Sequence, residues 1–142
     1  IQKKIPLIGK GQNKWQIIYV KDLANCIAFL TGNSNSIGEI FLCAEKKGKT
    51  LHELVEYIAK QFNISKISTI PVWLGKLLSQ LFLIQSKLTG KKALLIPAHL
   101  HRMLKERNYN TSKLQEIGWE AATSTEQAIQ ETIQAFRKQG KL

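Results

Sequence analysis

The stretch WQIIYVKDLANCIAFL, residues 15–30, changes its pattern of hydrophobic residues partway along. Residues 15–20 are rich in β-branched and aromatic side chains, which is typical of a short strand. From Leu23 onward the apolar residues fall close to one helical face. Asp22 stands at the junction, where its carboxylate would accept hydrogen bonds from the first helical turn and oppose the helix dipole. We therefore expect a strand that stops where Asp22 caps a helix.

Other segments indicate a second strand and several helices. EIFLCA, Glu39–Ala44, is an apolar strand candidate, whereas LIGKGQNK, residues 7–14, reads as a glycine-bearing loop. The cleanest amphipathic helix follows Thr50, which has capping-box spacing with Glu53. Further helices are predicted from Pro71 (apolar stripe Leu74, Leu77, Leu78, Leu81, Phe82), from Pro97 through Arg107, and from Ser124. ISKISTIPV, residues 64–72, is predicted to be a short extended segment. This order predicts an α/β chain that is mostly helical toward its end.

The chain of 142 residues suffices for about one domain. It begins with Ile1, its only methionine is Met103, and its opening residues lack the apolar run of a signal peptide. We therefore expect a piece of a longer chain. Two short strands do not make a stable sheet on their own, so their partner strands are expected upstream.

The net charge of +11 favours partners such as nucleic acid, acidic membranes or phosphorylated molecules. The lysines are scattered near the ends of predicted elements, which favours solvated loops, but a small basic module for nucleic acid or anionic surfaces stays open as an alternative. Cys26 and Cys43 are expected to be buried free thiols in a reducing compartment such as the cytoplasm. The most apolar run, residues 70–84, is interrupted by polar residues and suits an amphipathic helix rather than a membrane span.

A search for catalytic chemistry finds no self-contained active site. His99 and His101 lie two residues apart, on different faces of a helix, so they do not make a metal site. The GxSxG, HExxH, CxxC and Walker motifs are absent from the sequence. The GKG at residues 9–11 lacks the third glycine of a dinucleotide-binding motif. We expect neither a metal nor catalytic residues in this chain.

Four segments in order resemble the end of the extended short-chain dehydrogenases/reductases, the NAD-dependent epimerase/dehydratase family. They are IGKGQN with IIYVKDLANCIAFL, then GEIFLCAEKKGKTLHELVEYIA, IPVWL, and YNTSKLQEIGWEAATSTEQAIQETIQAF. The chain departs from the family pattern at Ile117, where leucine is usual, at Ala121 or Ala122, where proline is common, and at Asn110, where aspartate is frequent. The resemblance covers nearly the whole chain.

The resemblance implies that residues 1–142 are a C-terminal, substrate-binding region. Its strands would complete an upstream Rossmann sheet, and NAD or NADP would bind to that upstream domain. The family's glycine-rich turn and Tyr-x-x-x-Lys pair would also lie upstream of Ile1, so this region alone would be catalytically silent. Tyr109 and Lys113 have the catalytic spacing but lie in the wrong part of the chain. An unpaired edge at Glu39–Ala44 predicts a possible homodimer.

The resemblance also bears on the substrate, a small molecule that reacts at a carbonyl or hydroxyl group. Sugar-nucleotide epimerases commonly carry a diphosphate-binding arginine near the position of Trp15, beside Lys14. An aromatic residue there favours a more apolar substrate and the branch similar to dihydroflavonol reductases and 3β-hydroxysteroid dehydrogenases. A nucleotide-sugar epimerase or dehydratase is the alternative. The residues expected to contact substrate are Lys10, Gln12, Lys14, Trp15, Tyr19, Trp73, Arg102 and Tyr109.

Overall fold

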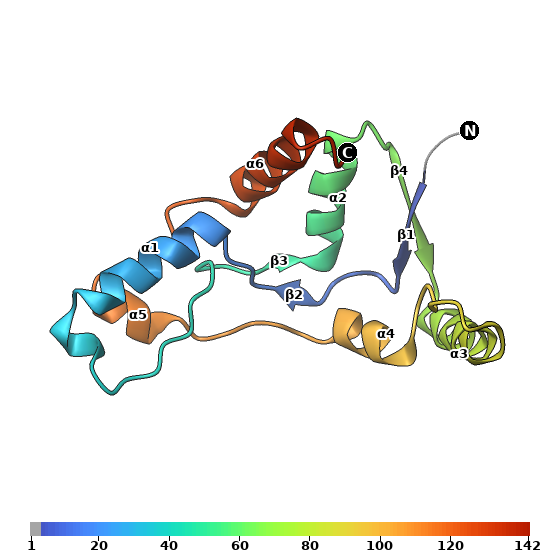
Figure 1. Ribbon diagram of the computed structural model, residues 1–142, viewed down its shortest axis with the longest axis horizontal. Coiled ribbons are helices and arrows are strands. Elements are labelled where there is room, and N and C mark those ends of the chain that lie inside the picture. Colours follow the sequence, from blue (N-terminus) through green and yellow to red (C-terminus); the bar gives the residue numbers. More distant parts are fainter. Residues whose placement is uncertain (1–3) are drawn as a thin grey trace. The chain divides into compact units, whose positions relative to one another are not determined.

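The computed structural model describes residues 4–142 and is mixed α/β, mostly helical with short strands, as predicted (Figure 1). Its residues fall into two compact units, the first formed by residues 4–13 and 50–106 and the second by residues 14–49 and 107–142. The strands are β1 (Lys4–Ile8), β2 (Lys14–Trp15), β3 (Lys49–Thr50) and β4 (Lys66–Ile70). The helices are α1 (Val20–Thr31), α2 (Leu51–Gln61), α3 (Val72–Thr89), α4 (Pro97–Leu104), α5 (Ser112–Glu116) and α6 (Thr125–Lys138), with a short 3₁₀ turn, η1, at Ser34–Ser36.

The first unit contains a parallel pair of strands that the sequence patterns did not predict. β1 pairs with β4, with Ile8 opposite Ile70, and the Gly9 amide extends the pairing by donating to the Ile70 carbonyl at 2.8 Å. Residues 7 and 8, expected in a loop, are therefore buried strand residues. β1 escaped prediction because KIPLI contains Pro6, which donates no backbone hydrogen bond and argues against a strand. The extended segment predicted at residues 64–72 contains β4, Lys66–Ile70, and its last residue, Val72, already begins α3.

Predicted helix starts agree with the structure at Thr50, Pro71, Pro97 and Ser124, whereas the start predicted at Asp22 does not. Thr50 and Glu53 form the full capping box at the start of α2: the Thr50 hydroxyl accepts from the Glu53 amide at 3.2 Å, and the Glu53 carboxylate accepts from the Thr50 amide at 2.7 Å. α3 begins directly after Pro71, and α4 begins at Pro97. The Ser124 side chain accepts from the Gln127 amide at the start of α6. These contacts lie within four residues, so sequence alone can specify them.

α3 turns a face of small residues toward the interior of the first unit. Gly75 and Ser79 are buried, and a Cβ atom at Gly75 would lie only 2.5 Å from the Ile8 Cγ2 atom of β1. The predicted apolar stripe is therefore wrong in part, because Leu77 and Leu81 are 51% and 53% exposed. A close helix–strand contact at a glycine leaves the larger side chains on the opposite face of the helix.

The second unit packs around Cys26, Leu114 and Trp119, with Phe41 and Cys43 among the side chains against them. Both cysteines are free thiols, as predicted. Burial, followed by the neighbouring Cys26 thiol, raises the pKa of Cys43 to about 12. The Cys43 thiol therefore stays protonated at neutral pH, which suits packing rather than nucleophilic chemistry.

The junction at Asp22 differs from the prediction. Regular strand structure is confined to β2, α1 begins at Val20, and its N-cap is Tyr19, so Asp22 lies inside the first turn and does not cap the helix. The buried Asp22 carboxylate instead accepts hydrogen bonds from the Thr123 amide at 3.0 Å and the Thr123 hydroxyl at 3.1 Å. Because this partner is about a hundred residues away along the chain, local spacing could not reveal it.

The predicted strand at Glu39–Ala44 is also wrong, because these residues have no regular secondary structure. Buried and exposed side chains still alternate along this segment, although it forms no sheet. Phe41 and Cys43 pack on the core, while Ile40 and Leu42 are 84% and 52% exposed. The strand edge on which a homodimer was predicted is therefore not formed. Within residues 4–142, no helix combines the length and apolarity that crossing a membrane requires.

The close contact at Gly75 predicts that replacing this helix glycine by alanine destabilises the protein, which is the opposite of the usual effect. An interior helix Gly→Ala substitution ordinarily stabilises by roughly 0.5–1 kcal/mol. Here the new methyl group would collide with Ile8, and such overpacking costs roughly 1–3 kcal/mol. We expect Gly75→Ala to lower the free energy of unfolding, measured by urea denaturation. In an Ile8→Ala background the same substitution should be neutral or stabilising, and a gain of stability in the wild-type background would contradict the contact.

Candidate substrate-binding site

A backbone bridge in the second unit joins β2 to a segment more than ninety residues away in the chain. The Arg107 amide donates to the Lys14 carbonyl at 2.8 Å, and the Gln16 amide donates to the Arg107 carbonyl at 2.8 Å. These bonds form a parallel bridge between Trp15 and Arg107, so the two side chains lie on the same side of it. The Arg107 guanidinium carbon lies 4.2 Å from the centroid of the Trp15 ring. At this separation the cation is attracted to the electron-rich face of the indole.

The buried side chain of Gln16 stabilises the bridge through hydrogen bonds. Its side chain is 7% exposed, and its amide group is hydrogen-bonded on both sides. The Gln16 Nε2 atom donates to the Glu45 carbonyl at 2.8 Å, and its Oε1 atom accepts a short hydrogen bond from the Tyr109 amide. A buried amide that satisfies both its donor and its acceptor fixes the segments that it joins. Residues 107–109 are thereby held beside β2.

The bridge brings together three of the residues predicted to contact substrate. Lys14, Trp15 and Tyr109 lie on or next to it, with Tyr109 47% exposed. Arg107 is a fourth member that the sequence patterns missed, because it was assigned to the end of the helix from Pro97, whereas α4 ends at Leu104. We call Lys14, Trp15, Arg107 and Tyr109 the Trp15 cluster. Its four residues are close along the bridge, but Lys14 and Trp15 are successive strand residues, so their side chains point to opposite faces.

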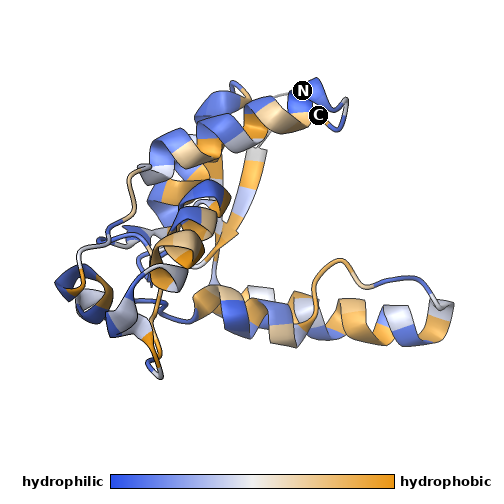
Figure 2. Ribbon diagram, turned by 60° about the vertical axis from the view of Figure 1, so that its left-hand side comes forward, coloured by the Kyte–Doolittle hydropathy of each residue, from blue (hydrophilic) through white to orange (hydrophobic). Residues whose placement is uncertain are grey.

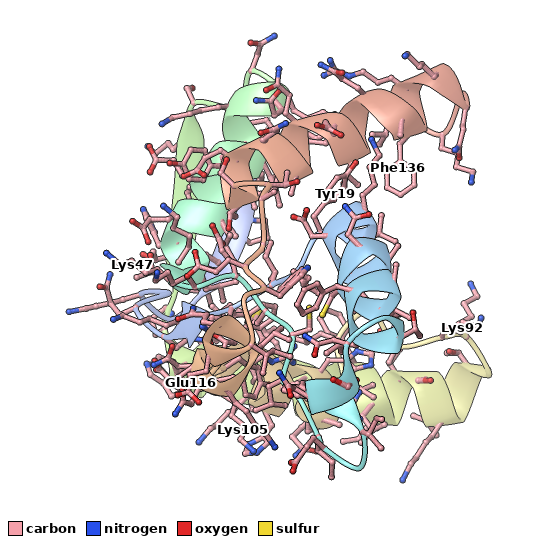
Figure 3. All side chains as sticks on the ribbon, turned by 90° about the vertical axis from the view of Figure 1, so that its left-hand side faces the viewer. Tyr19, Lys47, Lys92, Lys105, Glu116 and Phe136 are labelled. Carbon is pink, nitrogen blue, oxygen red and sulfur yellow. The ribbon has the colours of Figure 1, made fainter. Side chains whose placement is uncertain are left out.

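Tyr19, also predicted to contact substrate, is hydrogen-bonded to Glu131 in another part of the second unit. Its hydroxyl donates to the Glu131 carboxylate of α6 at 2.8 Å, and the Lys21 ammonium lies 3.0 Å from the same oxygen. Figure 3 shows the Tyr19 ring at the end of α1 facing α6. The hydrogen bond from Tyr19, followed by those from Gln127 and Lys21, lowers the pKa of Glu131 to about 2. The Tyr19 hydroxyl therefore joins α1 to α6.

The remaining predicted contact residues belong to the first unit. Lys10 lies at a hollow beside Thr69 and Pro71 at the end of β4. Gln12 is exposed, and its side chain donates to the Lys10 carbonyl at 3.4 Å. Trp73, on α3, is 68% exposed, and Arg102 is exposed on α4. Their roles as substrate contacts stay predictions.

The GKG turn after β1 does not fit a dinucleotide. Gly9 and Gly11 both have positive φ angles, of 78° and 64°. A Cβ atom at Gly11 would meet the Leu7 side chain at 2.8 Å and the His52 amide nitrogen at 2.9 Å, so this glycine makes room for the protein's own chain. A pyrophosphate cradle would need that space open. Within residues 4–142 there is also no group of three His, Cys, Asp or Glu side chains placed to hold a metal.

Comparison with known proteins gives one curated relative and two solved structures of note, while no family model matches the chain. The curated relative is the N-acetyl-α-D-glucosaminyl-diphospho-ditrans,octacis-undecaprenol 4-epimerase of Escherichia coli O157:H7, 25% identical over 133 residues. dTDP-glucose 4,6-dehydratase from Bacillus anthracis str. Ames, in complex with NAD, superposes with a TM-score of 0.61 at 24% identity. RMD from Pseudomonas aeruginosa, complexed with NADPH, superposes with a TM-score of 0.60 at 11% identity.

The predicted resemblance to the extended short-chain dehydrogenases/reductases is confirmed. The alignment with the epimerase includes 92% of this chain and 40% of that protein. The dehydratase and RMD cover 96% and 95% of this chain, which in turn covers 35% of each. At these sequence identities the two structures establish the fold. The chain thus spans well under half the length of each of these three proteins.

The Tyr19–Glu131 contact predicts a specific pH dependence. The pKa of Glu131 is lower in the folded protein than its ordinary 4.5, so the stability it contributes is present above pH 4.5 and is lost as the pH falls toward about 2. We expect Glu131→Gln to lower the melting temperature at pH 7, with the difference from wild type shrinking between pH 4.5 and 2. Melting curves followed by circular dichroism measure it. Glu116→Gln, at an exposed position of α5, is the control, and an equal effect there would contradict the assignment.

Proposed function

We propose that this chain is the substrate-binding part of an NAD(P)-dependent epimerase or dehydratase that acts on a sugar joined to a diphosphate. The observation that carries the proposal is the alignment of 92% of the chain with an epimerase whose named substrate is a sugar diphosphate linked to undecaprenol. dTDP-glucose, named for one structural neighbour, also carries its sugar on a diphosphate. The chain spans about 40% of the curated relative, so activity and substrate belong to the proposal and to the whole protein.

The chemistry of the Trp15 cluster suits such a substrate. Arg107 carries a planar guanidinium that can donate two parallel hydrogen bonds to phosphate oxygens, and it lies over the Trp15 ring. Trp15 and Tyr109 offer flat apolar surfaces and polar edges, which suit one face of a sugar ring or a base. The Gln16 hydrogen bonds hold the two cluster segments together before any ligand binds, which reduces the entropy lost on binding.

The sequence left two substrate classes open, a more apolar molecule and a sugar diphosphate, and Arg107 favours the second. Trp15 at the expected arginine position favoured an apolar substrate and the branch similar to dihydroflavonol reductases and 3β-hydroxysteroid dehydrogenases. Arg107, however, stacks on that same tryptophan, so a guanidinium stands at this place although it comes from another segment. This favours the nucleotide-sugar or lipid-diphosphate-sugar alternative. The assignment to the dihydroflavonol reductase branch stays a prediction.

The cofactor in this proposal is NAD or NADP, the two forms held by the structural neighbours. When bound, it supplies the hydride chemistry, and residues outside this chain hold it, because the GKG turn offers no cradle. This chain's residues then bind and orient the substrate, and residues 1–142 act as a single substrate-binding region. The two free thiols suit a cytoplasmic location.

The test uses the full-length protein with NAD and two substrates, UDP-N-acetylglucosamine and N-acetylglucosaminyl-diphospho-undecaprenol. We expect turnover of at least one of them. Arg107→Gln should raise KM roughly 10- to 100-fold, because hydrogen bonds to charged groups are worth about 1.5–3 kcal/mol. The matched control is Arg137→Gln on the last turn of α6, which should leave KM unchanged.

Two results would count against the proposal. If neither sugar diphosphate is converted, the proposal that the protein acts on a sugar joined to a diphosphate is wrong. An unchanged KM in Arg107→Gln, with turnover intact, would remove the Trp15 cluster as the binding site.

A further inference from the structure

α3 exposes a continuous apolar stripe. Its members recur at intervals of four, four, three and four residues, which places them on one face of the helix. Leu88 and Trp73 are 82% and 68% exposed, and the other three are each more than half exposed. Figure 2 shows hydrophobic segments alternating with hydrophilic ones along this helix. The stripe consists of Trp73, Leu77, Leu81, Ile84 and Leu88.

The charged residues that neighbour this stripe in the sequence are all positive. Lys76 and Lys87 border it on one edge, being three residues on from Trp73 and Ile84, and Lys91 comes directly after the C-cap residue Gly90. The surrounding sequence is more one-sided still: between Glu56 and Glu106 there is no aspartate or glutamate, and every charged residue is Lys or Arg. The apolar stripe therefore lies within a stretch of purely positive charge.

We infer that the α3 stripe binds the surface of an anionic lipid bilayer. An interfacial helix has an apolar face with tryptophan or leucine, lysines beside it, and its axis in the plane of the membrane. Trp73 suits the headgroup region, where aromatic rings with a polar edge accumulate. Lys76 and Lys87 can bury their methylene stems along the stripe and hold their ammonium groups among lipid phosphates.

Charge separates this occupant from a second copy of the chain. Two copies facing each other through α3 would oppose positive stretches of the same sequence, which is unfavourable. Anionic lipid supplies the complementary charge together with an apolar layer for the five stripe residues. α3 lies on the bilayer in this arrangement and does not cross it, in keeping with the lysines along it.

The inference stands on α3 and does not require the proposed function. If the function is also correct, the two combine. An enzyme that acts on a sugar linked to a polyprenol through a diphosphate meets its substrate at the membrane surface, and α3 would bring it there.

The experiment is vesicle co-sedimentation of the full-length protein with phosphatidylcholine vesicles, with and without phosphatidylglycerol. The test variant carries Leu77→Gln, Leu81→Gln and Leu88→Gln. The matched control carries Ile37→Gln, Ile40→Gln and Leu42→Gln, three residues of the second unit that are at least as exposed as Leu77. Circular dichroism checks that both variants are folded. Turnover of water-soluble UDP-N-acetylglucosamine is measured alongside, so that membrane binding and activity are read separately.

We expect wild type and control to bind the anionic vesicles, more weakly at high salt, and to bind pure phosphatidylcholine poorly. The α3 variant should bind at least about tenfold more weakly, because three apolar side chains no longer enter the lipid. Tryptophan emission should shift to the blue with anionic vesicles, and Trp73→Phe should abolish the shift. No binding to anionic vesicles, or an equal loss in the control, would overturn the inference. So would a concentration-dependent dimer that only the α3 variant disrupts.

Discussion

The pairing of residues 14–16 with Arg107 is the contact on which the candidate site depends. Three backbone segments far apart in the chain meet there, and the buried Gln16 side chain holds them by donating to Glu45 and accepting from Tyr109. If Gln16 were apolar, the Tyr109 amide and the Glu45 carbonyl would each lose a partner inside the protein. Leaving buried polar groups unpaired costs more than an average hydrogen bond contributes, so this amide constrains the geometry strongly.

The same dependence on distant contacts explains why the first unit exposes so much apolar surface. Gly75 allows α3 to approach Ile8 closely, and the small buried face then leaves the leucines at 77 and 81 pointing outward. A helix with apolar residues on both faces must bury one of them and present the other to something outside the unit. The lysines at the edge of the exposed face favour a negatively charged partner. An anionic lipid surface therefore fits this face better than another basic chain.

The Trp15 cluster is the place where the family resemblance can be compared with the contacts of the folded chain. Motif order was sufficient to reveal the resemblance to the extended short-chain dehydrogenases/reductases, and the match to an epimerase and the fold of two solved structures agree with it. Motif order was not sufficient to find the cation at the cluster. The sequence shows a tryptophan where the resemblance leads one to expect an arginine, whereas folding brings Arg107 to that tryptophan from a segment beyond α4. The proposed binding role of Arg107 therefore rests on a contact that only the folded chain creates.

Local chemistry was readable from the amino-acid order alone. The capping box at Thr50, the prolines before α3 and α4, and the Ser124 cap all act within one helical turn, so the residues that make each contact are neighbours in the sequence. Long-range partners were not readable. Asp22 bonds to Thr123, Arg107 stacks on Trp15, and β1 forms a strand only because β4 lies beside it. Periodicity reports which side chains are apolar, but the face that is buried, and the partner of each polar group, follow from which segments the folded chain brings together.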